Sequence, residues 1–141
     1  MSKTKRVPLS VMAEDTTLII GVASQETHIR MAWLLNKELM WKRRESKQDK
    51  DEDKGEKAWA VYNYETEEGY LVLMIVIKNG PPLGIPGLKN LDYLLFIREC
   101  EPSEVLGPIT KRLKEIPSVS FVQVIPASML KNIPEEFARC L

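Results

Sequence analysis

The stretch AWAVYNYETEEGYLVLMIVIK, from Ala58 to Lys78, decides the class of fold. Its first part alternates so that Tyr62 and Tyr64 share one face, which is typical of a β-strand with one buried side. The turn-forming residues Thr66–Gly69 follow, and the second part is apolar at nearly every position, as in a strand at the centre of a sheet. The stretch therefore predicts a β-hairpin whose second strand is buried on both faces.

Further elements are predicted on either side of this hairpin. β-Branched and apolar residues predict strands over 16–24, 91–98 and 118–126. Apolar residues at three- and four-residue spacing predict helices over 25–41 and 101–117. The first helix has a broad apolar face, which is made by Ile29, Ala32, Trp33, Asn36 and Met40 and is widened by Met31, Leu34, Leu35 and Leu39.

The beginnings of the two helices are predicted from their capping residues. We expect Ser24 to cap the first helix, with Glu26 in the first turn near the positive end of the helix dipole. If Ser103 caps the second helix, Pro108 lies beyond the first turn and removes one backbone hydrogen bond. We therefore expect a kink or a break near Gly107.

These elements predict one domain over residues 1–141. Helices with a single apolar face need a sheet to cover. The simplest arrangement is an α+β fold, in which two helices pack on one face of a single, mainly antiparallel sheet of about five strands, in a ferredoxin-like manner. In the segment Lys42–Lys57 thirteen of sixteen residues are charged. We expect this segment to be a solvated loop or a frayed helical extension, because it has nothing to fill a core.

Composition excludes several classes of protein. Apolar residues make up 44% and charged residues 28% of the chain, and its formal net charge is zero, so we do not expect a nucleic-acid partner. The longest apolar run is too short to cross a bilayer as a helix, and the N-terminus has no apolar region of signal-peptide length. Cys100 and Cys140 form no disulfide or metal-binding pattern. We therefore predict a cytoplasmic protein without a membrane partner.

Asp92 is the one carboxylate inside an apolar strand, and Tyr93 lies beside it. A buried carboxylate of this kind can act as a general acid or base. Alternatively, it can accept backbone N–H groups from the preceding Gly- and Pro-rich loop and hold that loop in place. We favour the structural interpretation, because no second catalytic residue accompanies Asp92.

Asn36 is a polar residue on the apolar face of the first helix, close to Trp33. The two could line a small-molecule pocket, although such an amide more often bonds a neighbouring loop. One hypothesis is that Asn36 and Asp92 both fasten the loop Gly80–Gly87. The candidate binding residues are therefore Trp33, Asn36, Asp92 and Tyr93.

No catalytic residue, metal site or cofactor is predicted. His28 is the single histidine, and a zinc or iron site usually needs two or more His or Cys ligands. No Gly-x-Ser-x-Gly motif accompanies His28. The segment GPPLGIPG, Gly80–Gly87, contains glycines, but its prolines lack the N–H groups that bind phosphate.

Four motifs in the chain resemble one known family. The stretch IPGLKNLDY, Ile85–Tyr93, resembles the signature of the IPExxxVDY family of small bacterial proteins, and AWLLNK, Ala32–Lys37, resembles the helix upstream of that signature. YNYETE, at 62–67, and LKEIPSVSFVQVI, at 113–125, are also similar, and the resemblance extends from about Thr17 to Val124. It implies a shared fold, but no activity, cofactor or substrate.

The signature differs from this chain at two positions. Gly87 stands where the signature has glutamate, and Leu91 stands where it has valine. Two kinds of function then remain. We expect a non-catalytic domain that acts through protein–protein contacts or self-association, in particular as a homodimer. The alternative is a small-ligand-binding regulatory domain of the ACT type, by analogy of fold.

Overall fold

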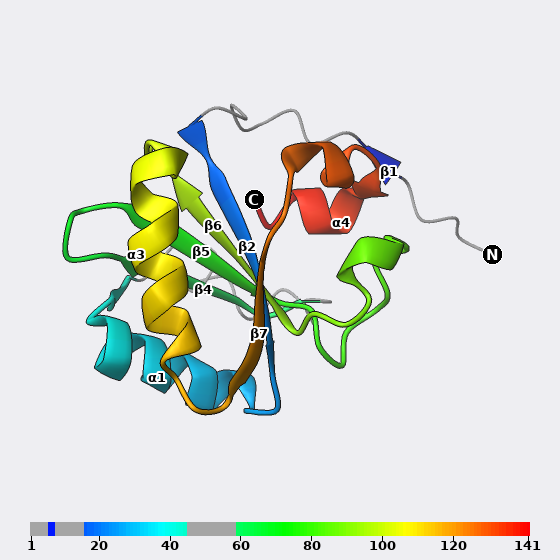
Figure 1. Cartoon of the computed structure of the whole chain (residues 1–141). Coiled ribbons are helices and arrows are strands. Elements are labelled where there is room, and N and C mark those ends of the chain that lie inside the picture. The colour runs from blue at the N-terminus through cyan, green and yellow to red at the C-terminus, as the bar shows by residue number, and fades with distance from the viewer. Residues whose placement is uncertain (1–5, 8–15, 45–58) are drawn as a thin grey trace.

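The computed structural model describes residues 6–7, 16–44 and 59–141. Its main feature is a six-stranded antiparallel sheet in the order β3-β4-β5-β6-β2-β7 (Figure 1). The strands are β2 (Leu18–Ser24), β3 (Lys42–Arg44), β4 (Val61–Glu65), β5 (Leu71–Val76), β6 (Tyr93–Arg98) and β7 (Val119–Val124). A second sheet pairs only β1 (Arg6–Val7) with β8 (Ile133–Pro134).

The α+β class and the single main antiparallel sheet are confirmed, with six strands in place of about five. The predicted hairpin is β4 and β5, which pair from Val61↔Ile75 to Glu65↔Leu71. Helices α1 (His28–Leu39) and α3 (Pro102–Lys114) cover one face of the sheet. Tyr62 and Tyr64 are buried beneath them, so these tyrosines belong to the core.

The buried face of α1 differs from the predicted one. Met31, Leu34, Leu35 and Leu39 pack on the sheet, whereas Ile29 is 72% exposed, Trp33 44% and Met40 54%. The prediction was right for Met31, Leu34, Leu35 and Leu39 but wrong for Ile29, Trp33 and Met40, because apolar residues occur on most sides of this helix and their spacing fits more than one face. The N-cap is Thr27, not Ser24, and its side chain accepts a hydrogen bond from the Arg30 N–H at 3.2 Å.

Helix α3 also begins differently from the prediction. Its N-cap is Glu101, and Ser103 lies within the first turn. The helix continues through Pro108, so the alternative of a break near Gly107 was wrong. Buried residues on both sides of the proline, among them Val105 and Ile109, attach the helix to the sheet and outweigh the one lost backbone bond.

The prediction of a charged loop over 42–57 was wrong at its beginning. Lys42–Arg44 form the edge strand β3, which pairs with β4 from Lys42↔Glu65 to Arg44↔Asn63. A strand needs only backbone partners, and these three side chains remain in solvent while the backbone pairs. The rest of that segment, 45–57, lies outside the described residues.

The other face of the sheet carries a second core that the sequence did not predict. It is covered by the segment between β5 and β6, by the 3-10 helix η4 (Ala127–Leu130) and by the short helix α4 (Glu135–Ala138). Leu130 and Phe137 from the C-terminal segment are completely buried there. The sheet is therefore covered on both faces, by long helices on one and by short turns and loops on the other (Figure 1).

Candidate functional site

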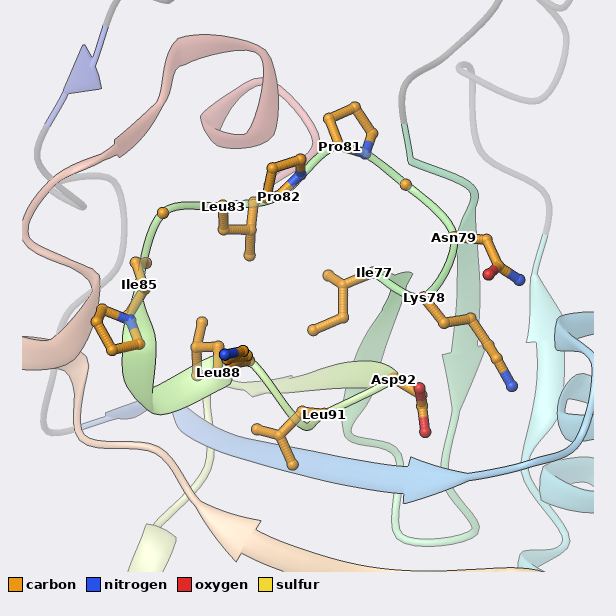
Figure 2. Close-up of a pocket in the computed structure, with 14 residues that line it drawn as sticks. Ile77, Lys78, Asn79, Pro81, Pro82, Leu83, Ile85, Leu88, Leu91 and Asp92 are labelled. Carbon is orange, nitrogen blue, oxygen red and sulfur yellow. The ribbon is translucent and has the colours of Figure 1, made fainter.

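A large pocket lies in the long connection between β5 and β6. All the residues around it belong to the segment Ile77–Asp92, and its volume is about 730 Å³. Figure 2 shows the chain curving around this hollow, with Leu83 and Leu88 pointing into it, Leu91 pointing toward β2, and Lys78 and Asp92 at one end. A volume of this size is typical of small-molecule sites.

The two ends of this loop are joined by backbone hydrogen bonds. The carbonyl of Asp92 accepts the N–H groups of Ile77 and Lys78, at 2.9 and 3.0 Å. Within the loop a 3-10 helix, η3 (Pro86–Leu88), begins at a proline, and Gly84 adopts a left-handed conformation with φ of 73°. These constraints define the shape of the loop without any ligand.

Apolar side chains form the inner side of the pocket. Leu83, Leu88 and Leu91 are each buried and belong to the second core, on the sheet face opposite α1 and α3. The pocket is therefore backed by fixed core side chains, which keep it open at little entropic cost when a ligand binds.

One end of the pocket is polar. The Asp92 Oδ2 atom accepts the backbone N–H of Ser24 at 2.8 Å. The Lys78 ammonium donates to the carbonyls of Ser24 and Glu26, at 2.9 and 2.8 Å. The hydroxyl of Tyr93 donates to the same Glu26 carbonyl at 2.5 Å. Asp92, Lys78 and Tyr93 thus attach the connection between β2 and α1 to the pocket loop.

Tyr93 is a neutral donor in this network. Burial raises the pKa of its hydroxyl well above the ordinary value, and the nearby carboxylates of Asp92 and Glu26 raise that pKa further. The Lys78 ammonium lies 5.5 Å from the centre of the Tyr93 ring. The tyrosine therefore contacts Lys78 through its ring, while its hydroxyl and the Lys78 ammonium donate to the same Glu26 carbonyl.

The expectation that the Asp92 carboxylate accepts N–H groups of the preceding Gly- and Pro-rich loop was wrong. Its Oδ2 atom accepts the N–H of Ser24 at the end of β2, and the Asp92 main-chain carbonyl accepts the N–H groups of Ile77 and Lys78. The hypothesis that Asn36 fastens the same loop was wrong. The Asn36 side chain donates to the carbonyl of Trp41 at 2.8 Å, where it closes the turn that leads from α1 into β3.

The four candidate binding residues divide between two places. Asp92 lines the pocket in the loop, and Tyr93 begins β6 beside it. Trp33 and Asn36 lie on the outer side of α1, next to a hollow of about 280 Å³ that also contacts Tyr62. The spacing of residues in the sequence does not show which of them lie close together in the fold, so the sequence could not separate these two pairs.

Residues of the site that the sequence did not single out are Ser24, Glu26 and Lys78. Ser24 and Glu26 contribute backbone groups, which a sequence pattern cannot show. Lys78 had a usable signal, because it is the first charged residue after a strand that is otherwise apolar.

The region around Trp33 is basic and aromatic. The Arg30 guanidinium lies 4.3 Å and the Lys37 ammonium 4.7 Å from the centre of the Trp33 ring. Trp41, which precedes the basic run of β3 in the sequence, is buried against Tyr64 and does not contribute to this surface.

The described residues offer no obvious reactive arrangement. Across residues 16–44 and 59–141 no group of three His, Cys, Asp or Glu side chains could hold a metal ion. The Nδ1 atom of His28 lies 2.5 Å from the Tyr62 hydroxyl. Burial raises the pKa of that hydroxyl. Neither residue lines the pocket in the loop.

Comparison of the chain with family models, with curated proteins and with solved structures found no match. Of the helices in the described part of the chain, none is long and apolar enough to cross a membrane. Any function must therefore be argued from the pocket and the surfaces described above.

Proposed function

We propose that the protein is a non-catalytic binding domain whose loop Ile77–Asp92 takes a small, largely apolar ligand. The observation that carries this proposal is the pocket itself, a hollow of about 730 Å³ that a constrained loop encloses over buried leucines. Binding without turnover, as in a regulatory domain, fits a pocket whose charged residues are occupied in holding the backbone.

The polar groups of the loop favour a ligand that donates hydrogen bonds. Pro81, Pro82 and Pro86 have no N–H, and several other loop N–H groups are already bonded to carbonyls. Only Oδ2 of the Asp92 carboxylate has a hydrogen bond within the described structure, so its other oxygen can accept one. We therefore infer a ligand with an apolar body and a hydroxyl, amide or ammonium donor.

Three probes of similar size test this inference: 2-phenylethylamine, 2-phenylethanol and 3-phenylpropanoate. A probe at about ten times its Kd should stabilise the fold by about 1.4 kcal/mol, which thermal unfolding can detect. We expect the amine and the alcohol to stabilise more than the carboxylate. Tighter binding of the carboxylate would show that Lys78 and Lys89 dominate the site, and would contradict the inference.

Two variants locate the binding. Asp92→Asn keeps an acceptor for the Ser24 N–H but removes the charge, so it should abolish the preference for the amine over the alcohol. Ile85→Trp should fill the pocket and remove the response to every probe. If the wild-type chain responds to none of the three probes, or if Ile85→Trp responds as the wild type does, the proposal fails.

Two finer assignments belong to the same proposal. A cytoplasmic location is supported by the buried Cys100, which forms no disulfide with any described residue. Membership of the IPExxxVDY family is supported by the segment Ile85–Tyr93, which forms much of the pocket loop and begins β6.

A further inference from the structure

The two edges of the main sheet have opposite character. β3 is three residues long, and Lys42, Arg43 and Arg44 all expose their side chains. β7 is six residues long, has the sequence VSFVQV and contains no charge and no proline. Proteins usually protect an edge strand with charges, prolines or shortness, because its free backbone groups can pair with another chain. β3 has this protection and β7 lacks it.

The backbone of β7 presents free hydrogen-bonding groups on its outer side. The Ile125 N–H donates to the Ile19 carbonyl at 2.9 Å, and the register pairs Gly21 with Gln123. Hydrogen-bonded pairs alternate along an antiparallel ladder, so Gln123 directs its N–H and C=O toward β2. Val122 and Val124 then direct theirs away from β2, and no described strand lies beyond β7.

Apolar side chains flank this free edge. Phe121 is 52% exposed and Val124 is 42% exposed, and the alternation of the strand places them on opposite faces of the sheet. Val122 is partly buried and packs against the core under α1 and α3. A strand that paired with β7 would cover apolar surface on both faces while it satisfied the backbone.

We propose that the protein forms a homodimer in which β7 pairs antiparallel with β7 of a second copy. A strand without charge can face itself without repulsion, whereas two copies of β3 would bring six cations together. This pairing continues the sheet across a two-fold axis and makes one sheet of twelve strands.

The directions of the backbone groups select the register. Val122 and Val124 must bond outward-facing residues of the second copy, so residues of the same parity face each other. Placing Val122 opposite Val122 of the second copy sets Phe121 opposite Gln123 of that copy. A shift by two residues in one direction would set Ser120 opposite Pro126, which has no N–H. A shift in the other direction would set Val124 opposite Ser118, which lies outside β7 and beyond the irregularity in its pairing with β2. We therefore place the axis at Val122.

Amide hydrogen exchange at two protein concentrations, about 10 µM and about 1 mM, tests both the surface and the register. The Val122 and Val124 amides should exchange more slowly at the higher concentration, because only the dimer protects them. The Phe121 and Gln123 amides, which already face β2, should change much less. Equal exchange of Val122 and Val124 at both concentrations would overturn the proposal.

Variants and sedimentation analysis give an independent test. Val124→Lys should weaken dimerisation about tenfold or more, because in each copy it places a charged side chain in the apolar surface that the paired strand covers. Val122→Pro removes an outward N–H and should do the same, and an edge position tolerates proline when its N–H faces solvent. The matched control is Ile29→Lys on the exposed side of α1, which should leave dimerisation unchanged. A wild-type chain that is monomeric at about 1 mM, or a Val124→Lys dimer as stable as the wild type, would refute the assignment.

Discussion

Gly21 of β2 lies directly against Leu91 of the pocket loop, and no side chain fits between them. A Cβ atom at position 21 would lie well inside the contact distance of the Leu91 Cδ1 atom, and 3.3 Å from the Ile125 Cδ1 atom. Leu91 is buried and lines the pocket. The glycine is therefore required by close packing, which lets the loop rest on the sheet.

Gly21→Ala should destabilise the protein by about 1–3 kcal/mol, because the added methyl group displaces Leu91 or bends β2. Urea unfolding measures this change. If the proposed ligand site is correct, the same variant should also weaken probe binding, because Leu91 forms part of the pocket.

Gly107→Ala is the matched control for that variant. Gly107 lies inside α3, and a Cβ atom there would have no neighbour within 4 Å. Alanine is a better helix former than glycine, but the ring of Pro108 disfavours helical backbone in a preceding residue that carries a Cβ atom, so the two effects offset and stability should change by less than about 1 kcal/mol. A loss at Gly107 as large as the loss at Gly21, or no loss at Gly21, would contradict the packing described for the two glycines.

The observed orientation of α1 can be tested by truncating one residue on each side. Leu35→Ala should cost about 2–5 kcal/mol, because it leaves a cavity between the helix and the sheet. Trp33→Ala should cost less than about 1 kcal/mol, because its ring is half exposed and contacts mainly Arg30 and Lys37. A larger loss of stability in Trp33→Ala than in Leu35→Ala in chemical denaturation would contradict the observed orientation of the helix.

Lys78→Met should destabilise the protein by about 1–2 kcal/mol, because the carbonyls of Ser24 and Glu26 lose their charged donor. Exchange of the amides around Ser24–Glu26 should accelerate, and this local effect distinguishes the variant from a general loss of stability. Lys89→Met, at an exposed position of the same loop, should change neither quantity.

Stability should fall at alkaline pH through Tyr93. Burial raises the pKa of Tyr93 in the folded state above its pKa in the unfolded chain, which is about 10. The neutral hydroxyl therefore makes its full contribution to the free energy of unfolding at pH values below about 10. That contribution is lost as the pH rises from about 10 toward the folded pKa, at up to about 1.4 kcal/mol per pH unit.

Urea unfolding of wild type and Tyr93→Phe between about pH 8 and 11.5 measures this dependence. The variant should be less stable at pH 8, because the bond to the Glu26 carbonyl is lost, but its stability should fall less steeply above pH 10. Burial also raises the pKa of Tyr64, which is still present in the variant. Part of the fall in stability with rising pH should therefore remain in Tyr93→Phe. An equal or steeper slope in Tyr93→Phe would contradict the assignment.

Local patterns gave the hairpin and the fold class, because alternation and a four-residue turn depend on neighbouring residues. They did not give the buried side of α1, because apolar residues surround most of that helix. The second core was missed for a different reason. Leu130 and Phe137 pack against the loop and sheet from the far end of the chain, and no periodicity marks a contact of that range.

The candidate site was only partly predictable. Asp92 and Tyr93 stood out as polar groups in an apolar strand, and both lie at the site or beside it. Asn36 stood out as a polar residue on the apolar face of the first helix, with Trp33 close to it, but both lie elsewhere. Main-chain carbonyls of Ser24 and Glu26 complete the polar end, and a backbone group carries no signature in the sequence.

The place of β2 in the sheet has a consequence for the order of events during synthesis. β2 is made before both of its neighbours, β6 and β7, which lie far downstream of it in the chain. Its backbone groups must remain hydrated until translation has delivered first β6 and then β7. We therefore expect slow, late closure of the sheet, since pairing across such separations carries a large entropic barrier, and a nascent chain that benefits from chaperone protection meanwhile.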